Sequence, residues 1–368
     1  MNDDRPSRLL PTPARRDEPA AGAGLRALLL RLMRGENLSR AEAAALLDAL
    51  LEECATDAQI AGALVALALK GETVEELTGM AEAMRARAVR IETKHERFID
   101  TAGTGSSAAK TFNVSTAAAF IIAGAGLPVA KHGSRAATSR SGSADVLAAL
   151  GVDVTVPPAV SQNCLDELGI CFMFAPLYHG ATARVAGVRR QLGVHTTFNL
   201  LGPLTNPAGA PRQIIGVWHA ALVEPLARTL AALGTERAWV VHGRDGLDEI
   251  TVSDKTLVAE ASGGDVRAFE VAPEDFGLAR ANLEELRGGD AEMNASIIRD
   301  VLAGERRDAA RALVVANAAS ALYVGGAAGS LGEAAELAAQ SIDSGSALDK
   351  LRRFAEATSA RTNTPDLN

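Results

Sequence analysis

The sequence predicts a small all-α helical bundle joined to a larger α/β domain with a central, mainly parallel sheet. Between Leu25 and Ile91, apolar residues recur at the spacing of helix faces. From Phe98 onward, short apolar runs of strand type alternate with helical patterns, which is typical of a parallel sheet. Aromatic residues make up only 4% of the chain, so alanine, leucine and valine must fill the core.

Four short helices are expected in the first part. Their apolar patterns are LRALLLRLMRG, AEAAALLDALLEE, DAQIAGALVALALKG and VEELTGMAEAMRARA. Residues 39–42 read Ser-Arg-Ala-Glu and residues 73–76 read Thr-Val-Glu-Glu, so each segment predicts a capping box at a helix start. Gly35 and Gly71 follow helical patterns and mark expected helix ends.

The second part is expected to alternate between strands and helices. In order come the strand FIDTAG, the helix STAAAFIIAGAG, the strand and loop LPVAKHG, the helix ADVLAALG, the alternating segment VDVTV, a helix over Val160–Leu168 and the strand ICFMFA. After a further helical stretch, IIGVWH and AWVVHG are predicted strands on either side of a helix at Ala221–Leu233. TLVAEASGGDVRAFEVA is a predicted antiparallel pair, and residues 282–360 are predicted to be mostly helical.

The charge and the cysteine content of the chain argue against several classes of protein. A net charge of −8 argues against a broad nucleic-acid surface, which would be basic. The three cysteines show no CxxC spacing, which favours buried thiols in a reducing compartment. No apolar stretch reaches the length of a membrane span, and the proline-rich first 24 residues favour a disordered arm over a signal peptide. We therefore expect a cytoplasmic protein.

The loops after the predicted strands are the candidate ligand sites, because parallel sheets bind ligands at the carboxyl ends of their strands. The first candidate runs from Asp100 to Ser107 and continues through Thr111–Thr116. Its glycines let the backbone approach a phosphate, and N–H groups at a helix start bind anions. An ordinary strand–turn–helix connection with a Ser/Thr cap has the same pattern, so both interpretations stay open here.

The second candidate runs from Lys131 to Ser143. It holds three cations, one histidine and five hydroxyls in 13 residues. Cations and hydroxyls together suit a polyphosphate. Because the chain as a whole is acidic, this concentration of basic and hydroxyl residues in one loop favours polyphosphate binding over a solvated basic loop.

The third candidate is Gly243–Glu249, which ends in the adjacent carboxylates Asp248 and Glu249. Mg²⁺ prefers such oxygen ligands and keeps several waters. Taken alone, however, an Asp-Glu pair is more typical of an acidic surface turn.

The fourth candidate is a basic helix near His179 that carries Arg184, Arg189 and Arg190. One arginine there could clamp a substrate carboxylate with two hydrogen bonds, and a solvated basic helix face is an equal alternative. The following segment, Asn199–Pro207, contains two prolines and is interpreted as a structural hinge or crossover without a chemical role.

In this order, the four loops resemble the anthranilate phosphoribosyltransferase family, in the nucleoside phosphorylase-like class of phosphoribosyltransferases. The resemblance runs from about Gly24 to Ala357. It rests on ATDAQIAGALVALALKGETVEEL, GTG, TFNVST, KHGSR, SRSGSADVLAALG, VRRQLG, FNLLGPLTNPAG, VHGRDGLDEI and GGDAEMNA.

The resemblance implies transfer of phosphoribosyl from phosphoribosyl pyrophosphate (PRPP) to anthranilate in tryptophan biosynthesis, with release of pyrophosphate. It implies Mg²⁺ as cofactor, an aromatic carboxylate as the second substrate and a homodimer formed through the small domain. The implied domains are a helical domain at 24–92 with a helical excursion at about 178–200, and an α/β domain at 93–177 and 201–360. Residues 1–23 and 361–368 are an arm and a tail.

The resemblance also implies roles for individual residues. The implied PRPP-binding residues are Gly103, Ser106, Ser107, Thr111, Asn113, Val114, Ser115, Thr116, Lys131, Gly133, Ser134, Ser139 and Ser143. The implied acceptor-binding residues are Gly103, His132, Ser134, His179 and Arg189. The implied metal-linked residues are Ser115, Asp248 and Glu249. No general acid or base is assigned, because an arylamine is already a nucleophile.

The sequence departs from the family pattern at three places. Ser106 and Ser107 replace the Gly-Asp of the usual Gly-Thr-Gly-Gly-Asp, which removes a carboxylate near the metal and pyrophosphate. Ser134 replaces the Asn of Lys-His-Gly-Asn-Arg, and residues 179–182 read His-Gly-Ala-Thr where His-Pro-Ala-Met is common. Two of these changes fall on the acceptor side, so a related transferase with another aromatic acceptor is the main alternative. A nucleoside phosphorylase and a non-catalytic nucleic-acid-binding relative are weaker alternatives.

Overall fold

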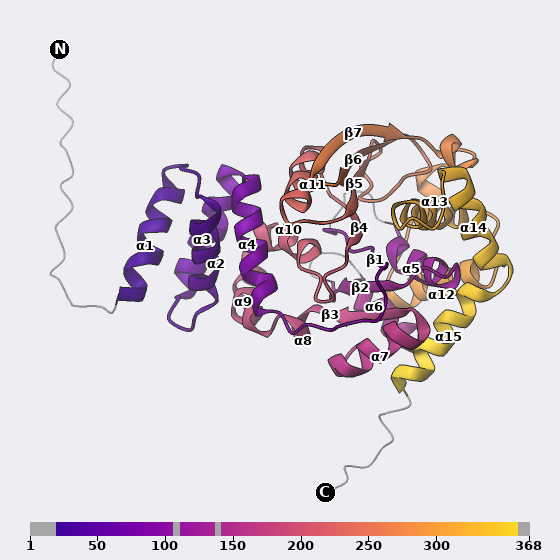
Figure 1. Ribbon diagram of the computed structural model, residues 1–368, viewed down its shortest axis with the longest axis horizontal. Helices are drawn as coiled ribbons and strands as arrows, with labels where there is room; N and C mark the ends of the chain where they lie inside the picture. Colours follow the sequence, from indigo (N-terminus) through magenta and orange to yellow (C-terminus); the bar gives the residue numbers. More distant parts are fainter. Residues whose placement is uncertain (1–19, 106–110, 137–140, 360–368) are drawn as a thin grey trace, which may run out of the picture.

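The computed structural model describes residues 20–105, 111–136 and 141–359, which form a helical bundle beside a larger α/β part (Figure 1). The bundle helices are α1 (Ala20–Met33), α2 (Arg40–Leu51), α3 (Asp57–Lys70) and α4 (Val74–Arg87). All four were predicted. The expected capping boxes begin α2 at Ser39 and α4 at Thr73, and a further one begins α3 at Thr56.

Seven strands form one sheet in the order β3-β2-β1-β4-β5-β6-β7. They are β1 (Ile99–Asp100), β2 (Val129–Gly133), β3 (Ile170–Phe174), β4 (Arg212–Gly216), β5 (Arg237–Gly243), β6 (Thr256–Ser262) and β7 (Asp265–Val271). Strands β1 to β5 are parallel, and β6 and β7 add an antiparallel edge. The predicted mainly parallel sheet and the predicted antiparallel pair are therefore confirmed.

Helices connect the strands and follow the sheet. They are α5 (Val114–Gly124), α6 (Ser143–Ala149), α7 (Pro158–Leu168), α8 (Ala175–Tyr178), α9 (Ala183–Leu192), α10 (Thr197–Leu204), α11 (Val223–Ala232), α12 (Ala291–Leu302), α13 (Ala309–Val324), α14 (Leu331–Asp343) and α15 (Ser346–Ser359). Across the described ranges, no helix is both long and apolar enough to cross a bilayer.

Two sequence expectations fail in detail. The alternating VDVTV segment buries Val152, Val154 and Val156 but pairs with no strand among the described residues, because a turn interrupts it. The second candidate loop was expected to begin at Lys131, yet β2 continues through Gly133 and pairs with β3 up to Phe174. The side chains of Lys131 and His132 are therefore held by a central strand.

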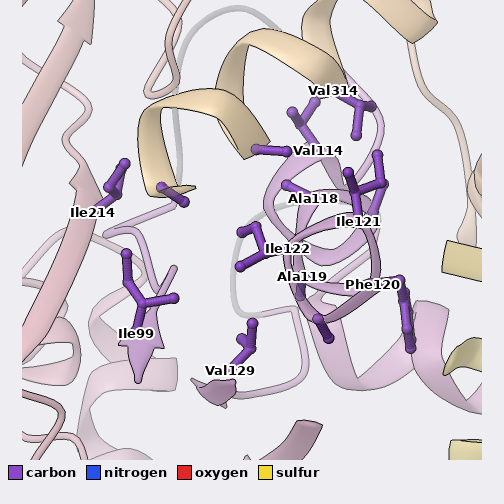
Figure 2. Close-up of a cluster of buried hydrophobic side chains, with 14 of the residues drawn as sticks. Ile99, Val114, Ala118, Ala119, Phe120, Ile121, Ile122, Val129, Ile214 and Val314 are labelled. Carbon is purple, nitrogen blue, oxygen red and sulfur yellow. The ribbon is translucent and has the colours of Figure 1, made fainter. Parts of the chain in front are cut away.

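Two hydrophobic clusters build the core. In the first, Ile99, Val129 and Ile214 extend from the sheet toward α5, where Ile122 lies beside them (Figure 2). The second cluster joins the bundle, α10, α11 and the opposite face of β4, β5 and β6. Because the bundle and the sheet share this second cluster, α9 and α10 connect the two parts as one packed unit.

Candidate active site

A cavity of about 480 Å³ lies between the carboxyl ends of the parallel strands and helices α4, α9 and α10. It brings together the first two candidate loops, the carboxylate pair and one arginine of the basic helix. The predicted site residues that line it are Gly103, Thr111, Asn113, Val114, Ser115, Thr116, Lys131, His132, Gly133, Ser134, Ser143, His179, Arg189, Asp248 and Glu249. Ser106, Ser107 and Ser139 lie outside the described residues.

Lys131 is a buried cation at the floor of the cavity. Its Nζ donates to the Thr101 carbonyl at 3.1 Å and to the hydroxyls of Thr101 and Ser115 at 3.2 Å each. Burial lowers the pKa of Lys131, while Asp100 and Glu249 oppose that shift. Since Ser115 lies in the first turn of α5, the ammonium group stands beside helix N–H groups that favour anions.

The carboxylate of Asp100 connects three segments by hydrogen bonds beneath the first loop. One carboxylate oxygen accepts the main-chain N–H groups of Ala102 at 3.1 Å and His132 at 3.2 Å. The other accepts Asn206 Nδ2 at 2.7 Å. Complete burial raises the pKa of Asp100 to about 6, although Lys131 and these hydrogen bonds act in the opposite direction.

The second loop is shaped by Asp145, whose carboxylate accepts the N–H groups of Ala136 and Gly142 at 3.0 Å each. Glycine is required at two of its positions. A Cβ on Gly142 would come 2.4 Å from the Ala136 nitrogen, and one on Gly133 would come 2.3 Å from the Ser143 hydroxyl oxygen. The described ends of the loop therefore lie close together, and the hydroxyl residues Ser134, Ser141 and Ser143 line the cavity.

The start of α5 is fixed by a distant side chain. Asn294 on α12 donates from Nδ2 to Asn113 Oδ1 at 3.0 Å. Asn113 in turn donates to the Ser141 carbonyl at 3.3 Å, which links the first loop to the second. The two loops thus form one connected wall.

The carboxylate pair follows β5 and reaches the opposite wall. A Cβ on Gly216 would come only 1.6 Å from the Asp248 carbonyl oxygen, so β4 and this loop can touch only through glycine. Asn317 fixes the loop by accepting the Ile250 N–H at 2.9 Å and donating to its carbonyl at 2.8 Å. The pair therefore faces the cavity and is not the surface turn that its composition alone favoured.

The chemistry of the pair fits a hard divalent cation. Burial and the neighbouring Asp248 raise the pKa of Glu249 to about 8, which Lys131 and the Ser115 N–H only partly oppose. Two adjacent carboxylates that repel each other favour a cation between them. Within the described chain, no group of three or more His, Cys, Asp or Glu residues could hold a metal, so substrate or water oxygens would complete the shell of such a cation.

Of the three arginines on the basic helix, only Arg189 lines the cavity. Its Nη2 donates to Asn199 Oδ1 at 3.1 Å, and its guanidinium lies 5.5 Å from the centre of the Phe198 ring. Burial lowers the pKa of Arg189. Arg184 instead pairs with Asp57 on the bundle at 3.2 Å, so the basic helix places one cation in the site and turns the others outward.

Two buried histidines complete the wall next to Arg189. The rings of His132 and His179 lie with centroids 5.1 Å apart, and each residue is 4% exposed. Burial lowers the pKa of His132 to about 3 and that of His179 to about 4, so both are neutral near pH 7. His132 Nδ1 lies 3.1 Å from the Gly202 carbonyl oxygen.

Sequence reasoning missed several supporting residues. Asp145, Asn206, Asn294 and Asn317 each hold a cavity loop by hydrogen bonds from another element. Three of them fall within quoted motifs, Asp145 in SRSGSADVLAALG, Asn206 in FNLLGPLTNPAG and Asn294 in GGDAEMNA, but no role was assigned to any of them. The segment Asn199–Pro207 was interpreted as purely structural, yet Asn199, Gly202 and Pro203 line the cavity.

Loops of the kind that bind phosphate follow the carboxyl ends of the parallel strands, and a helical bundle lies across the cavity from them. This architecture defines a glycosyl transferase built from two parts. The family model "Glycosyl transferase family, a/b domain" matches residues 95–348, and "Glycosyl transferase family, helical bundle domain" matches residues 26–88. The chain belongs to the anthranilate phosphoribosyltransferase family.

Relatives and solved structures support this placement. The chain is 52% identical over 328 residues to an anthranilate phosphoribosyltransferase of Moorella thermoacetica, covering 89% of this chain and 96% of the relative. It is 53% identical over 330 residues to one from Rubrobacter xylanophilus, covering 90% and 96%.

Two solved structures extend the comparison. The Thermus thermophilus enzyme superposes with a TM-score of 0.85 at 41% identity, covering 90% of this chain and 99% of that one. The Saccharomyces cerevisiae enzyme in complex with PRPP and Mg superposes with a TM-score of 0.83 at 28% identity, covering 92% and 98%.

Proposed function

We propose that this chain transfers the phosphoribosyl group of PRPP to anthranilate, giving N-(5-phosphoribosyl)anthranilate and pyrophosphate in tryptophan biosynthesis. One observation carries the proposal: the described parts of the Gly103–Thr116 and Lys131–Ser143 segments, the Asp248–Glu249 pair and Arg189 border a single cavity. A diphosphorylated sugar requires the first three features, and an aromatic carboxylate requires the fourth.

In the proposed reaction, the amine nitrogen attacks C1 of the ribose while the bond from C1 to the pyrophosphate oxygen breaks. The bonding electron pair leaves with pyrophosphate, and the amine releases one proton after attack. Lys131 and the N–H groups at the start of α5 stabilise the charge that grows on the leaving group. Arg189 holds the acceptor carboxylate, so positioning supplies much of the catalysis.

The donor side binds PRPP through loop donors and hydroxyls. We assign this role to Gly103, Thr111, Asn113, Val114, Ser115, Thr116, Lys131, Gly133, Ser134 and Ser143, all of which line the cavity. Gly103, His132, Ser134, His179 and Arg189 form the acceptor side, where Gly103 and Ser134 border both substrates.

Mg²⁺ is the proposed cofactor, held by Asp248, Glu249 and the Ser115 hydroxyl together with PRPP oxygens. When bound, it neutralises charge on the pyrophosphate. Changing Asp248 and Glu249 together to alanine should raise the Mg²⁺ concentration needed for half-maximal turnover by at least about tenfold. Asp265→Ala, an exposed carboxylate on β7, is the matched control. An unchanged Mg²⁺ titration in the double variant would contradict the assignment.

The direct test of function is an assay with the purified chain, PRPP and Mg²⁺ that follows the fluorescence of anthranilate. We expect a loss of fluorescence that depends on both PRPP and Mg²⁺, with one pyrophosphate released for each anthranilate consumed. If anthranilate fluorescence did not fall at saturating PRPP, the proposal would be contradicted.

A second candidate is the same transfer to a different aromatic acceptor. It is favoured by Ser134, Gly180 and Thr182, which line the acceptor end of the cavity and depart from the family pattern. Pyrophosphate release with another aromatic acid, but none with anthranilate, would select it.

We also propose that the chain acts as a cytoplasmic homodimer formed through the bundle. An apolar groove runs between α1 and α3, and Met33 is 75% exposed and Leu69 84% exposed beside it. Exposed apolar groups of this size on facing helices are typical of an interface between subunits. All three cysteines are free, which accords with a reducing compartment; Cys164 and Cys171 are buried as expected, whereas Cys54 is exposed.

A further inference from the structure

Asn113 stands at the N-cap of α5 but does not cap that helix. Asparagine is favoured at an N-cap because its side-chain oxygen ordinarily accepts an N–H group of the first turn. The Asn113 side chain makes no such hydrogen bond. Its Oδ1 instead accepts Asn294 Nδ2 at 3.0 Å and the Ser141 hydroxyl at 3.3 Å. Because an amide oxygen has two lone pairs, both are used by groups outside α5.

A chain of hydrogen bonds fixes the orientation of both amide side chains. A main-chain N–H can only donate, so the atom of Asn294 that meets the Gly289 N–H at 2.8 Å must be its oxygen. The nitrogen of Asn294 then faces Asn113 and meets an oxygen there. The nitrogen of Asn113 faces the Ser141 carbonyl at 3.3 Å, which can only accept. Neither amide can therefore turn over without losing hydrogen bonds.

Main-chain contacts hold the start of α12 against the first loop. Arg287 pairs with Thr111 as an isolated antiparallel bridge. A Cβ on Gly288 would come 2.6 Å from the Phe112 nitrogen, so the two segments can approach this closely only through glycine. Asn294, near the start of α12, is 3% exposed. Its amide is thus buried and anchored beside the loop that it contacts.

In this orientation, Asn113 has a hydrogen-bond donor left for a ligand. Asn113 lines the cavity, and both lone pairs of its oxygen are in use. The Ser141 carbonyl takes only one of the two hydrogens on Asn113 Nδ2, which leaves the second for a ligand oxygen. Reversal of this amide would replace the donor with a carbonyl oxygen, which repels an anion.

Resting on the transferase function proposed above, we propose that Asn294 is a positioning residue for the phosphoribosyl donor. Its Nδ2 occupies the oxygen of Asn113 and so keeps that amide from capping its own helix or turning over. An N–H of Asn113 then remains for a phosphate or pyrophosphate oxygen of PRPP. Asn294 itself does not line the cavity, so it acts only through Asn113.

The test measures the binding of PRPP with Mg²⁺ to the full chain by calorimetry, together with the KM of each substrate. Asn294→Ala removes every hydrogen bond of the amide. Asn294→Asp keeps an oxygen for the Gly289 N–H but, at pH 8, well above the ordinary pKa of an aspartate, has no hydrogen for Asn113. Asn282→Asp is the matched control, because Asn282 is exposed, does not line the cavity and caps Glu284 through an oxygen that aspartate retains. Thermal melting identifies any variant that fails to fold.

A double-mutant cycle with Asn113→Ala separates orientation of the amide from a general support of α12. Asn113→Ala should itself weaken PRPP binding by about tenfold, because it removes the donor. Adding Asn294→Ala should then weaken binding by less than about twofold more, because the amide that Asn294 orients is gone. A residue that merely supported α12 would cause its full loss in both backgrounds.

We expect both Asn294 variants to weaken PRPP binding by at least about tenfold, as for a hydrogen bond to a charged oxygen, while the KM for anthranilate changes by less than about twofold. Wild-type affinity in Asn294→Asp would show that only the Gly289 contact matters. That result, an equal rise in both KM values, or a full further loss in the double variant would overturn the inference. A wild type that binds PRPP but does not consume anthranilate would contradict the transferase function alone, so the two failures are distinguishable.

Discussion

At the scale of single residues, the cavity separates two substrates by charge. Lys131 and the start of α5 provide the anion-binding side, and among the described residues Arg189 is the cation that lines the cavity from α9 and α10. A substitution on one side of such a site should therefore change the binding of one substrate and leave the binding of the other nearly unchanged.

Arg189→Ala should raise the KM for anthranilate by about 10- to 100-fold, because a hydrogen bond to a charged group contributes about 1.5–3 kcal/mol. The KM for PRPP should change by less than about twofold. Arg190→Ala is the control, since Arg190 is exposed and does not line the cavity. Steady-state kinetics with each substrate varied in turn provide the measurement, and an equal loss for both substrates would contradict the role of Arg189.

Asp100 predicts a pH effect on stability. Its pKa is raised from 3.8 to about 6, so the folded state binds more protons than the unfolded state between these values, and its contribution to stability falls as pH rises through that window. In Asp100→Asn, residue 100 has no carboxyl group to ionise, so this fall in stability with rising pH is absent. Relative to wild type, the variant should therefore gain up to about 3 kcal/mol in unfolding free energy between pH 4 and pH 7. Urea unfolding across that range measures it, and a constant difference between the two proteins would refute it.

Individual residues were predicted best where the chain sequence itself places them together. The candidates at Thr111–Thr116 and at Asp248–Glu249 follow strands and line the cavity, although composition alone favoured a surface turn for the carboxylate pair. Asn294 and Asn317 were not predicted, because each reaches its loop from a helix far along the chain. Periodicity contains no information about such long-range hydrogen bonds.

At the scale of elements, close backbone contacts position the loops. β4 ends at Gly216, whose missing side chain lets the Asp248 carbonyl approach. Thr104 also donates its N–H to the Gly216 carbonyl at 2.9 Å, so one glycine joins the first loop to the carboxylate loop. The relative position of these two loops depends on this contact.

Gly216→Ala should therefore displace the carboxylate loop. We expect a fall in PRPP turnover of at least about tenfold and a loss of stability of about 1–3 kcal/mol, the usual cost of overpacking. Gly332→Ala on α14 is the control, because a Cβ there meets nothing within 4 Å. Activity and thermal unfolding are the readouts, and a Gly216→Ala enzyme with unaltered turnover would show that the loops are not coupled in this way.

Helices with local signals were predicted with their starts, whereas the extent of a strand depends on partners far along the chain and was predicted less well. The bundle helices are marked by apolar spacing and capping boxes close in sequence. The strand predicted at FIDTAG is present, but β1 contains only two of its residues, which are those that pair with β2 and β4. The VDVTV segment has the alternation of a strand but, among the described residues, no neighbour with which to pair.

At the scale of the whole molecule, the cavity lies where the bundle meets the sheet. Met84 on α4 lines it opposite the strand ends, and Arg85 on the same helix donates from Nε to the Leu204 carbonyl at 2.7 Å. A change in the position of the bundle would therefore be transmitted to α10 and to the acceptor side. This arrangement suits substrates that enter between two parts of a protein.

The apolar groove on the bundle predicts the state of assembly. Leu69→Asp should convert a dimer into a monomer at micromolar concentration, because a charge at the centre of an apolar interface must be desolvated. Leu348→Asp, on α15 away from the bundle, should leave the mass unchanged. Sedimentation analysis distinguishes the outcomes, and a dimer that survives Leu69→Asp would place the interface elsewhere.

Calorimetry with PRPP provides the most direct test of how the site works. Titrating PRPP with Mg²⁺ into the full chain should give saturable heat with one site per chain. The affinity should fall by at least about tenfold in Lys131→Met, which removes the buried ammonium group between Thr101 and Ser115. Absence of heat from the wild type, or equal affinity in Lys131→Met, would contradict the proposal that these loops bind the sugar donor.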